Sequence, residues 1–221
     1  MHGLIERACV VFEPVAVVSI LTGTLIAFVV HEYAHAFAAY QLGDPTPKYE
    51  GRLTLNPLVH LHPIGSIMLV ATMLMSQGSL VAGWAKPVRF EYSNLKSPFF
   101  DGGIIAFAGP LSNFIVAFLL GVLTQLVLPT NLIYPVALIV AANLGFGLFN
   151  CFPFPALDGW KMLQAVVPTS FAEKLRDLEQ RTGLYGIFIL LVGSYFLVDP
   201  VLKPTFRFLM QIAVGSWPLS P

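Results

Sequence analysis

The residues best suited to chemistry stand together in the segment HEYAH, from His31 to His35. On a helix, positions i and i+4 share one face, so both imidazoles would point the same way with Glu32 beside the metal they bind. Two imidazoles and an adjacent carboxylate are the groups with which zinc peptidases bind the metal and activate water. The spacing therefore indicates a zinc site that uses His31 and His35, with Glu32 as its acid/base.

This segment ends a long apolar run that begins near Pro14. A charged side chain at the centre of a bilayer costs about 2.5 to 3.5 kcal/mol, so ionisable groups in such a run indicate a function. The alternative to a metal site is that His31 and His35 lie at the headgroup boundary and are hydrogen-bonded to neighbours or water. That alternative is weaker for a complete motif than for a lone histidine.

A catalytic zinc takes three protein ligands and leaves a fourth position for water, so a third ligand is needed. The best candidate is Asp158 in the stretch NCFPFPALDG. Pro153 and Pro155 end the preceding helix, and Gly159 allows a close turn of the backbone. The alternative for Asp158 is an Asp-Gly turn that caps the next segment.

Three motifs, in this order and each in or beside an apolar segment, carry a family resemblance: HEYAH, AGPLSN and NCFPFPALDG. Together they resemble the site-2 protease family of intramembrane zinc metalloproteases. The stretches GRLTLNPLVHLHPIG (51–65) and GWAKPV (83–88) are similar to a compact prokaryotic branch of that family, which has no PDZ domain. An acidic residue is common in this branch where the present chain has His62.

The resemblance implies an enzyme, a zinc-dependent endopeptidase that holds one Zn²⁺ per chain. Its implied metal ligands are His31, His35 and Asp158, its catalytic acid/base is Glu32, and Asn150 contributes to binding the substrate or intermediate. The implied substrates are membrane-anchored proteins or membrane-peptide remnants. A bound zinc would lower the pKa of its water to about 7 and polarise the scissile carbonyl.

Composition agrees with a membrane protein. The 221 residues are 56% hydrophobic and 11% charged, against about 25% charged in soluble domains. Twelve basic residues balance twelve acidic ones, so no overall basic field recruits nucleic acid. Two cysteines far apart predict neither a disulfide framework nor a thiolate metal site.

The predicted fold is an all-α polytopic membrane protein with about five to six transmembrane helices. Clear spans are predicted at 14–40, 103–128, 131–152 and 183–198, and a weaker segment at 205–217 could lie in the membrane interface. The first span is expected to be retained rather than cleaved as a signal peptide. We expect one membrane-embedded metalloprotease domain over 1–221, with a core at about 14–165 and C-terminal helices at about 183–217.

The segment 64–83 decides whether the site can assemble. If it crosses the bilayer, the spans that carry HEYAH and Asp158 are antiparallel, and their C-terminal ends lie on opposite faces. If it is re-entrant, the two spans are parallel and bring the three ligands to one side. The re-entrant topology also gives the sharper bias of Lys and Arg, which places the active site toward the cytoplasm of a prokaryotic cell membrane.

Several smaller predictions complete the interpretation. The segments 49–55 and 87–92 have strand-like composition and could offer an edge to an unwound substrate, or they could be ordinary loop strands. His60 and His62 are expected at the interface rather than as extra ligands. Two other functions stay open: a catalytically inactive relative that acts as a membrane scaffold or chaperone, and a metal transporter, although transporters place ligands mid-span on several helices.

Overall fold

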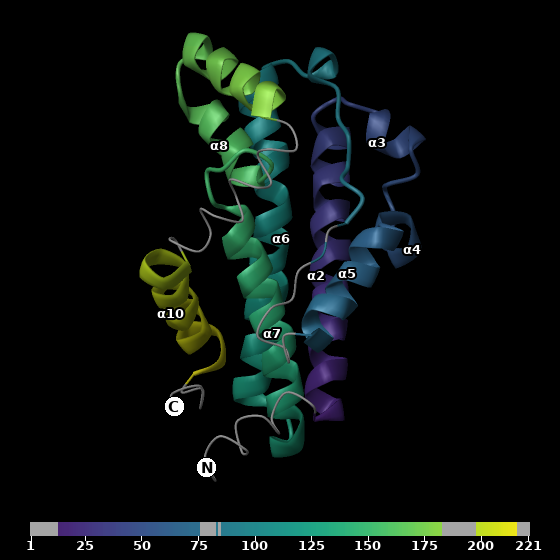
Figure 1. Cartoon of the computed structure of the whole chain (residues 1–221), viewed down its shortest axis with the longest axis vertical. Helices are drawn as coiled ribbons and strands as arrows, with labels where there is room; N and C mark the ends of the chain where they lie inside the picture. The colour runs from purple at the N-terminus through teal and green to yellow at the C-terminus, as the bar shows by residue number, and fades with distance from the viewer. Residues whose placement is uncertain (1–12, 76–82, 84, 183–197, 216–221) are drawn as a thin grey trace.

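Three long helices form the frame of the molecule in the computed structural model, which describes residues 13–75, 83, 85–182 and 198–215. They are α2 (Pro14–Gln41), α6 (Pro98–Leu126) and α7 (Thr130–Asn150), and they run side by side (Figure 1). Each is long and apolar enough to cross a membrane. The predicted spans at 14–40, 103–128 and 131–152 are thereby confirmed. The predicted span at 183–198 lies almost wholly outside the described residues.

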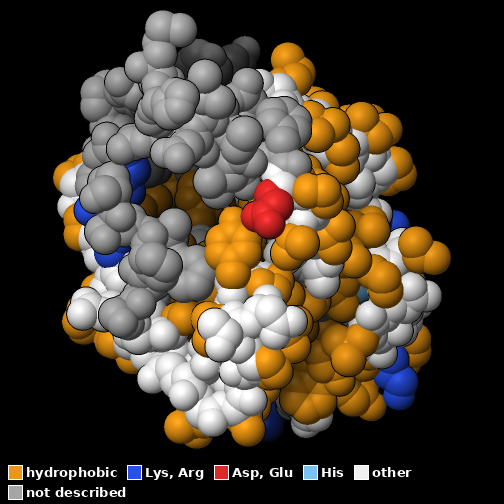
Figure 2. Space-filling model, turned by 90° about the horizontal axis from the view of Figure 1, so that it is seen from below, with side chains coloured by type: hydrophobic (Ala, Val, Ile, Leu, Met, Phe, Trp, Pro, Cys, Tyr) orange, Lys and Arg blue, Asp and Glu red, His pale blue; other side chains and the backbone are white. Residues whose placement is uncertain are grey.

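The frame helices turn apolar side chains outward. On α6, Leu111, Ile115, Leu119, Val122 and Leu126 are all at least 40% exposed and recur at helical spacing, which is the pattern of a lipid-facing stripe. Figure 2 shows the same property from one end, where hydrophobic side chains cover most of the described surface. Together the apolar helices and this surface make the chain a membrane protein.

The segment 64–83 returns to the point from which it started. Helix α5 (Pro63–Met75) forms the first part of this segment. Gly83 lies against the beginning of α5, because a Cβ built on it would stand 2.7 Å from the carbonyl oxygen of Gly65 and 2.6 Å from Cβ of Leu69. Leu61 and Ala85 form an antiparallel bridge just outside these ends. The two ends therefore lie together, as re-entry requires.

Because the ends of this segment lie together, α2 and α7 run parallel to each other. Helix α6, which lies between them in the sequence, runs antiparallel to both. The C-terminal ends of α2 and α7 point toward the same end of the molecule (Figure 1). Short helix α8 (Asp158–Val166) follows α7 there and packs against α6. This topology brings HEYAH and Asp158 to one side of the frame.

Around the frame lie short elements. Helices α3 (Thr46–Tyr49) and α4 (Pro57–His60) follow α2, and the turn η1 (Tyr92–Asn94) precedes α6. Near the C-terminus, η2 (Val198–Leu202) leads into α10 (Lys203–Val214), which is too short to span and packs on α6 and α7 through Met210 and Ala213. The predicted total of five to six spans is not confirmed by the described residues, which hold three.

The short β-strands predicted near the site are also not confirmed. In the part of the chain that the structure describes, the single strand-like pairing is the Leu61–Ala85 bridge. Residues 49–55 begin at the end of α3 and continue as turns, because Gly51 adopts a positive φ of 70° and folds the chain back on itself. Residues 86–91 have no regular secondary structure and no partner strand among the described residues.

Candidate metal centre

Helix α2 presents both histidines of HEYAH from one face. His31 and His35 are 3% and 8% exposed, and their ring centroids lie 4.5 Å apart with the ring planes at 89°. One helical turn separates them, as the i, i+4 spacing predicts. Phe146 of α7 packs edge-on against His31 at 4.9 Å, so an apolar wall closes this side of the site.

Asp158 reaches the histidines from the turn between α7 and α8. The chain leaves α7 at Asn150 and turns through the two prolines, and Asp158 is the first residue of α8. Gly159 is necessary in this turn, because a Cβ there would stand 2.3 Å from the carbonyl oxygens of Cys151 and Phe152. Ala156 adopts a positive φ of 83°, which is strained for a residue with a side chain.

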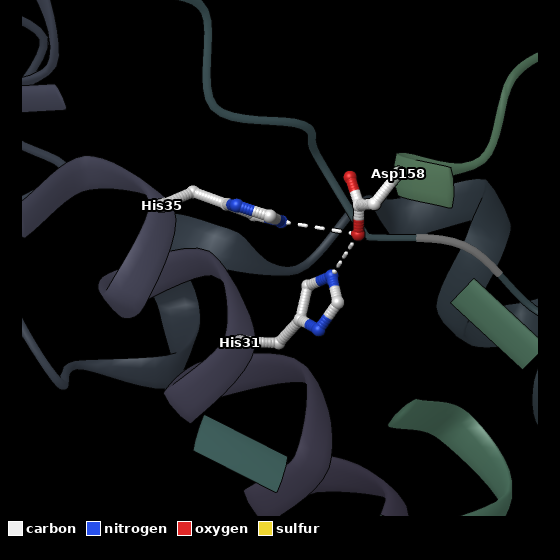
Figure 3. A group of neighbouring side chains, drawn as sticks. All are labelled: His31, His35 and Asp158. Carbon is white, nitrogen blue, oxygen red and sulfur yellow. Dashed lines mark ion pairs between the residues drawn. The ribbon is translucent and has the colours of Figure 1, made fainter. Parts of the chain in front are cut away.

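The three side chains converge, as Figure 3 shows. Oδ2 of Asp158 lies 2.9 Å from Nε2 of His31 and 3.3 Å from Nε2 of His35. One potential ligand atom from each residue falls within 4.8 Å of the other two. The same Oδ2 is buried and has no hydrogen-bond partner.

A hydrogen-bond partner outside the cluster holds the Nδ1 atom of each imidazole. Nδ1 of His35 lies 2.7 Å from the carbonyl oxygen of Ile105, which can only accept, so this Nδ1 carries the proton. Nδ1 of His31 lies 2.8 Å from Oδ1 of Asn113, whose amide nitrogen donates to the carbonyl oxygen of Ala27. Both rings therefore direct Nε2 at Asp158.

This donor set fits zinc. Three lone-pair atoms that face one another repel unless a cation, either a proton or a metal ion, lies among them. Burial alone raises the pKa of Asp158, but His35 and His31 outweigh it and hold the pKa below its usual range, so the side chain is a carboxylate. Ligands about 2.1 Å from a tetrahedral zinc stand about 3.4 Å apart, close to the two separations in this cluster. Imidazole nitrogens held by outer partners are the usual zinc ligands.

Gly109 of α6 makes room for the rings. A Cβ at this position would stand 2.5 Å from both Cε1 and Nε2 of His35, and 2.7 Å from Cε1 of His31. Small residues such as those of AGPLSN permit close helix packing, and here Gly109 packs directly against the two imidazoles. Asn113 of the same motif bonds across helices to His31.

Glu32 lies beside the cluster and is 8% exposed. Its Oε2 accepts a hydrogen bond of 2.9 Å from the backbone N–H of Val88. Sequence reasoning missed this contact, because a backbone donor leaves no signature in residue type.

The other candidates lie outside the cluster. Asn150 ends α7, and its amide nitrogen donates to the carbonyl oxygen of Phe146, 2.9 Å away. His60 is fully buried with Nε2 2.7 Å from the carbonyl oxygen of Thr54, and Nδ1 of His62 accepts from the N–H of Gly65. Neither histidine belongs to the metal-binding group found among the described residues. Burial and the charge of Asp158 raise the pKa of Cys151 to about 11, so this residue is a thiol at neutral pH.

Comparison with curated proteins finds relatives that share most of the chain. The "Putative zinc metalloprotease YwhC" of Bacillus subtilis is 34% identical over 203 residues, which cover 84% of this chain and 87% of the relative. The "Putative zinc metalloprotease Rip2" of Mycolicibacterium smegmatis is 27% identical over 190 residues, and its Mycobacterium tuberculosis counterpart is 29% identical over 185. These alignments cover 85% and 80% of this chain, and 69% and 68% of the relatives. No family model and no solved structure matches the chain.

Proposed function

Because the chain belongs to the site-2 protease family of zinc metalloproteases, we propose that it cleaves membrane-anchored proteins in or near their transmembrane segments. The observation that carries this proposal is the convergence of His31, His35 and Asp158 on one point, with ligand atoms within 4.8 Å. Two of the three residues belong to α2, a helix long and apolar enough to span a membrane. A peptide bond that reaches this point comes from a substrate inside or beside the bilayer.

In this proposal His31, His35 and Asp158 hold one Zn²⁺. The bound ion supplies a water of lowered pKa and polarises the scissile carbonyl. Asn113 and the carbonyl of Ile105 hold both rings with Nε2 toward the ion, because each accepts the Nδ1 proton. A metal ion binds the neutral imidazole, so any proton on Nε2 leaves when the ion binds.

Glu32 acts as the acid/base. Its carboxylate takes the proton of the attacking water and later delivers it to the leaving amine. Its position, one residue after His31, supports this role, and the Val88 N–H holds one of its oxygens. Asn150 donates to the oxyanion that forms on the substrate carbonyl. Because the Asn150 amide is bonded to Phe146, this last role requires its side chain to change rotamer.

We place the enzyme in the cytoplasmic membrane of a prokaryotic cell, as one membrane-embedded domain whose active site faces the cytoplasm. The support is the distribution of charge. The loops at the C-terminal ends of α2 and α7 and at the N-terminal end of α6 carry most of the described lysines and arginines. Short loops rich in these residues stay on the cytoplasmic side.

Purified protein in proteoliposomes with a single-pass reporter tests the proposal. We expect the wild type to contain one zinc per chain and to cleave the reporter within or next to its membrane span. Glu32→Gln should keep the zinc and lose cleavage, since an amide cannot accept the proton. Glu173→Gln makes the same chemical change on an exposed residue of the helical segment 169–182 and should cleave normally.

Three results would contradict the proposal. Cleavage by Glu32→Gln at the wild-type rate would remove Glu32 from the reaction. Full zinc content in Asp158→Ala would remove this residue from the metal site. Cleavage confined to soluble peptides, with an intact membrane reporter, would leave a zinc protease whose substrates lie outside the membrane.

A further inference from the structure

A strap of chain without regular secondary structure, residues 85–91, contacts Glu32 on its way from the segment 64–83 to η1. Its backbone N–H groups are used at three points. Lys86 donates to the carbonyl oxygen of His60 at 2.7 Å, Val88 donates to Glu32 at 2.9 Å, and Glu91 donates to Asp44 at 2.8 Å. The N–H groups of Lys86 and Val88 thus both bond to the surrounding protein.

The hydrogen bond from the Val88 N–H links the orientation of the Glu32 carboxylate to the position of the strap. A hydrogen bond from a backbone amide to a carboxylate is charge-assisted and stronger than one between neutral groups. Its donor is part of the main chain, so the orientation of the carboxylate depends on where the strap lies. A misplacement of about 1 Å at a reacting group can cost about 100-fold in rate.

Arg52 also binds the strap, through the carbonyl oxygen of Lys86. This arginine is 2% exposed, and arginine is rarely buried so fully. Its Nη1 donates to the carbonyl oxygen of Val59 at 2.8 Å and to that of Lys86 at 3.3 Å. The nearest carboxylate oxygen, of Glu50, stands 3.9 Å from Nε, beyond hydrogen-bond length. The hydrogen bonds of this buried guanidinium group therefore go to the two backbone carbonyls of Val59 and Lys86.

The two carbonyls that accept from Arg52 lie where the loop after α3, which contains α4, meets the strap. Val59 precedes His60, which accepts from Lys86, and Lys86 stands two residues before Val88. Arg52 therefore binds the loop and the strap at the point where they meet. A change at Arg52 releases the strap near Val88 without touching the zinc ligands.

We propose that Arg52 is a positioning residue for peptide hydrolysis, and that it holds the strap so that the Val88 N–H orients the Glu32 carboxylate. The inference rests on the proposed function, because it assigns Glu32 the role of acid/base. Arg52 does not touch the reacting atoms. Its effect passes through Lys86 and the backbone of the strap.

Kinetics separate positioning from a general loss of structure. In Arg52→Met we expect kcat to fall at least about tenfold, while KM stays within about twofold and zinc stays at one per chain. Arg52→Lys retains the charge but lacks the planar fork of donors, so it should recover only part of kcat. Arg181→Met, which removes an exposed arginine far along the chain in segment 169–182, should match the wild type.

Hydrogen exchange at the Val88 amide reads the contact directly and needs no protease activity. We expect exchange to accelerate at least about tenfold in Arg52→Met and in Glu32→Ala, which lose the anchor and the acceptor. Glu32→Gln keeps an acceptor oxygen but loses the charge, so its exchange should lie between those of the wild type and Glu32→Ala. This readout stands even if the chain proves to cleave nothing, so failure of the inference and failure of the proposed function are distinguishable.

Two outcomes overturn the proposal: wild-type exchange at Val88 in Arg52→Met, or a fall in kcat together with zinc loss or an equal rise in KM. If Arg52→Met does not fold, Val88→Pro against Val88→Ala decides the matter. Proline removes the donor and alanine keeps it. A low kcat in the proline variant alone supports the orienting role of this N–H, and equal kcat in both variants refutes it.

Discussion

Gly109 offers a demanding test of the metal centre, because one added methyl group enters the cluster directly. In Gly109→Ala the new Cβ would stand 2.5 Å from two ring atoms of His35 and 2.7 Å from one of His31. Ordinary contacts of this kind are about 3.5 to 4.0 Å, so the rings or α6 must move by about 1 Å. The rings are tied to Asn113 and to Ile105 by bonds of 2.8 and 2.7 Å, which resist that movement.

The expected loss follows from these numbers. Overpacking of this size costs about 1 to 3 kcal/mol, and each 1.4 kcal/mol is a factor of ten in affinity. We therefore expect zinc affinity to fall about tenfold to 100-fold in Gly109→Ala. Competition with a calibrated chelator in detergent measures the affinity, and thermal unfolding of the metal-free protein measures the fold.

Gly145→Ala is the matched control on α7. A Cβ there meets no atom closer than 3.8 Å, a ring carbon of Phe206, so the same substitution in another frame helix adds a methyl group without a clash. This variant should bind zinc as the wild type does. Undiminished zinc affinity in Gly109→Ala would refute the packing of α6 against the two imidazoles.

Three further predictions concern the supports of the site. Asn113→Ala removes the acceptor of the His31 Nδ1 proton, and chelator competition should show zinc affinity about ten- to 100-fold lower; an unchanged affinity would mean that another group fixes the ring. Burial raises the pKa of Asp44, but its donors, Thr46, Asn94 and Glu91, outweigh it and hold the pKa below its usual range. The stabilisation of the fold by the ionised Asp44 is therefore present above pH about 4 and is lost as pH falls through the folded-state pKa. Asp44→Asn should lower the unfolding free energy by about 1.5 to 3 kcal/mol at pH 7, and by progressively less in acid. A pH-independent difference in unfolding free energy would contradict this. Ala156→Gly removes the strain of a positive φ, which stabilises the folded state by about 1 to 2 kcal/mol. The freer unfolded chain of the glycine variant offsets about 0.4 to 1 kcal/mol of this gain, so the unfolding temperature should rise. A lower unfolding temperature would show that the methyl group is needed.

The metal cluster was the part most accessible from sequence. HEYAH fixes two imidazoles on one helical face by spacing alone, and the prolines and glycine around Asp158 indicate a turn that can aim a carboxylate. Between a spanning and a re-entrant segment at 64–83 the sequence favours re-entry, because a crossing would put the ligands on opposite faces, and re-entry stays a prediction. The contact of Gly83 with Gly65 now gives the same answer from packing.

The contacts that support the cluster were less accessible. An asparagine in an apolar helix is typical of a cross-helix hydrogen bond, but the partner of Asn113, His31, depends on how α6 is rotated against α2. The N–H of Val88 and the carbonyl of Ile105 belong to the backbone, which every residue shares. The strands expected at 49–55 and 87–92 failed because β-propensity describes a half-buried pleated surface, and the described chain offers these segments no sheet to join.

The order of the ligands along the chain has a consequence for biogenesis. The two imidazoles leave the ribosome on the first frame helix, whereas the carboxylate follows only after α6 and α7 have been made. A nascent chain thus holds an incomplete coordination set until the second and third frame helices have entered the bilayer. A proteolytic metal centre with three protein ligands therefore forms only after the frame is in place.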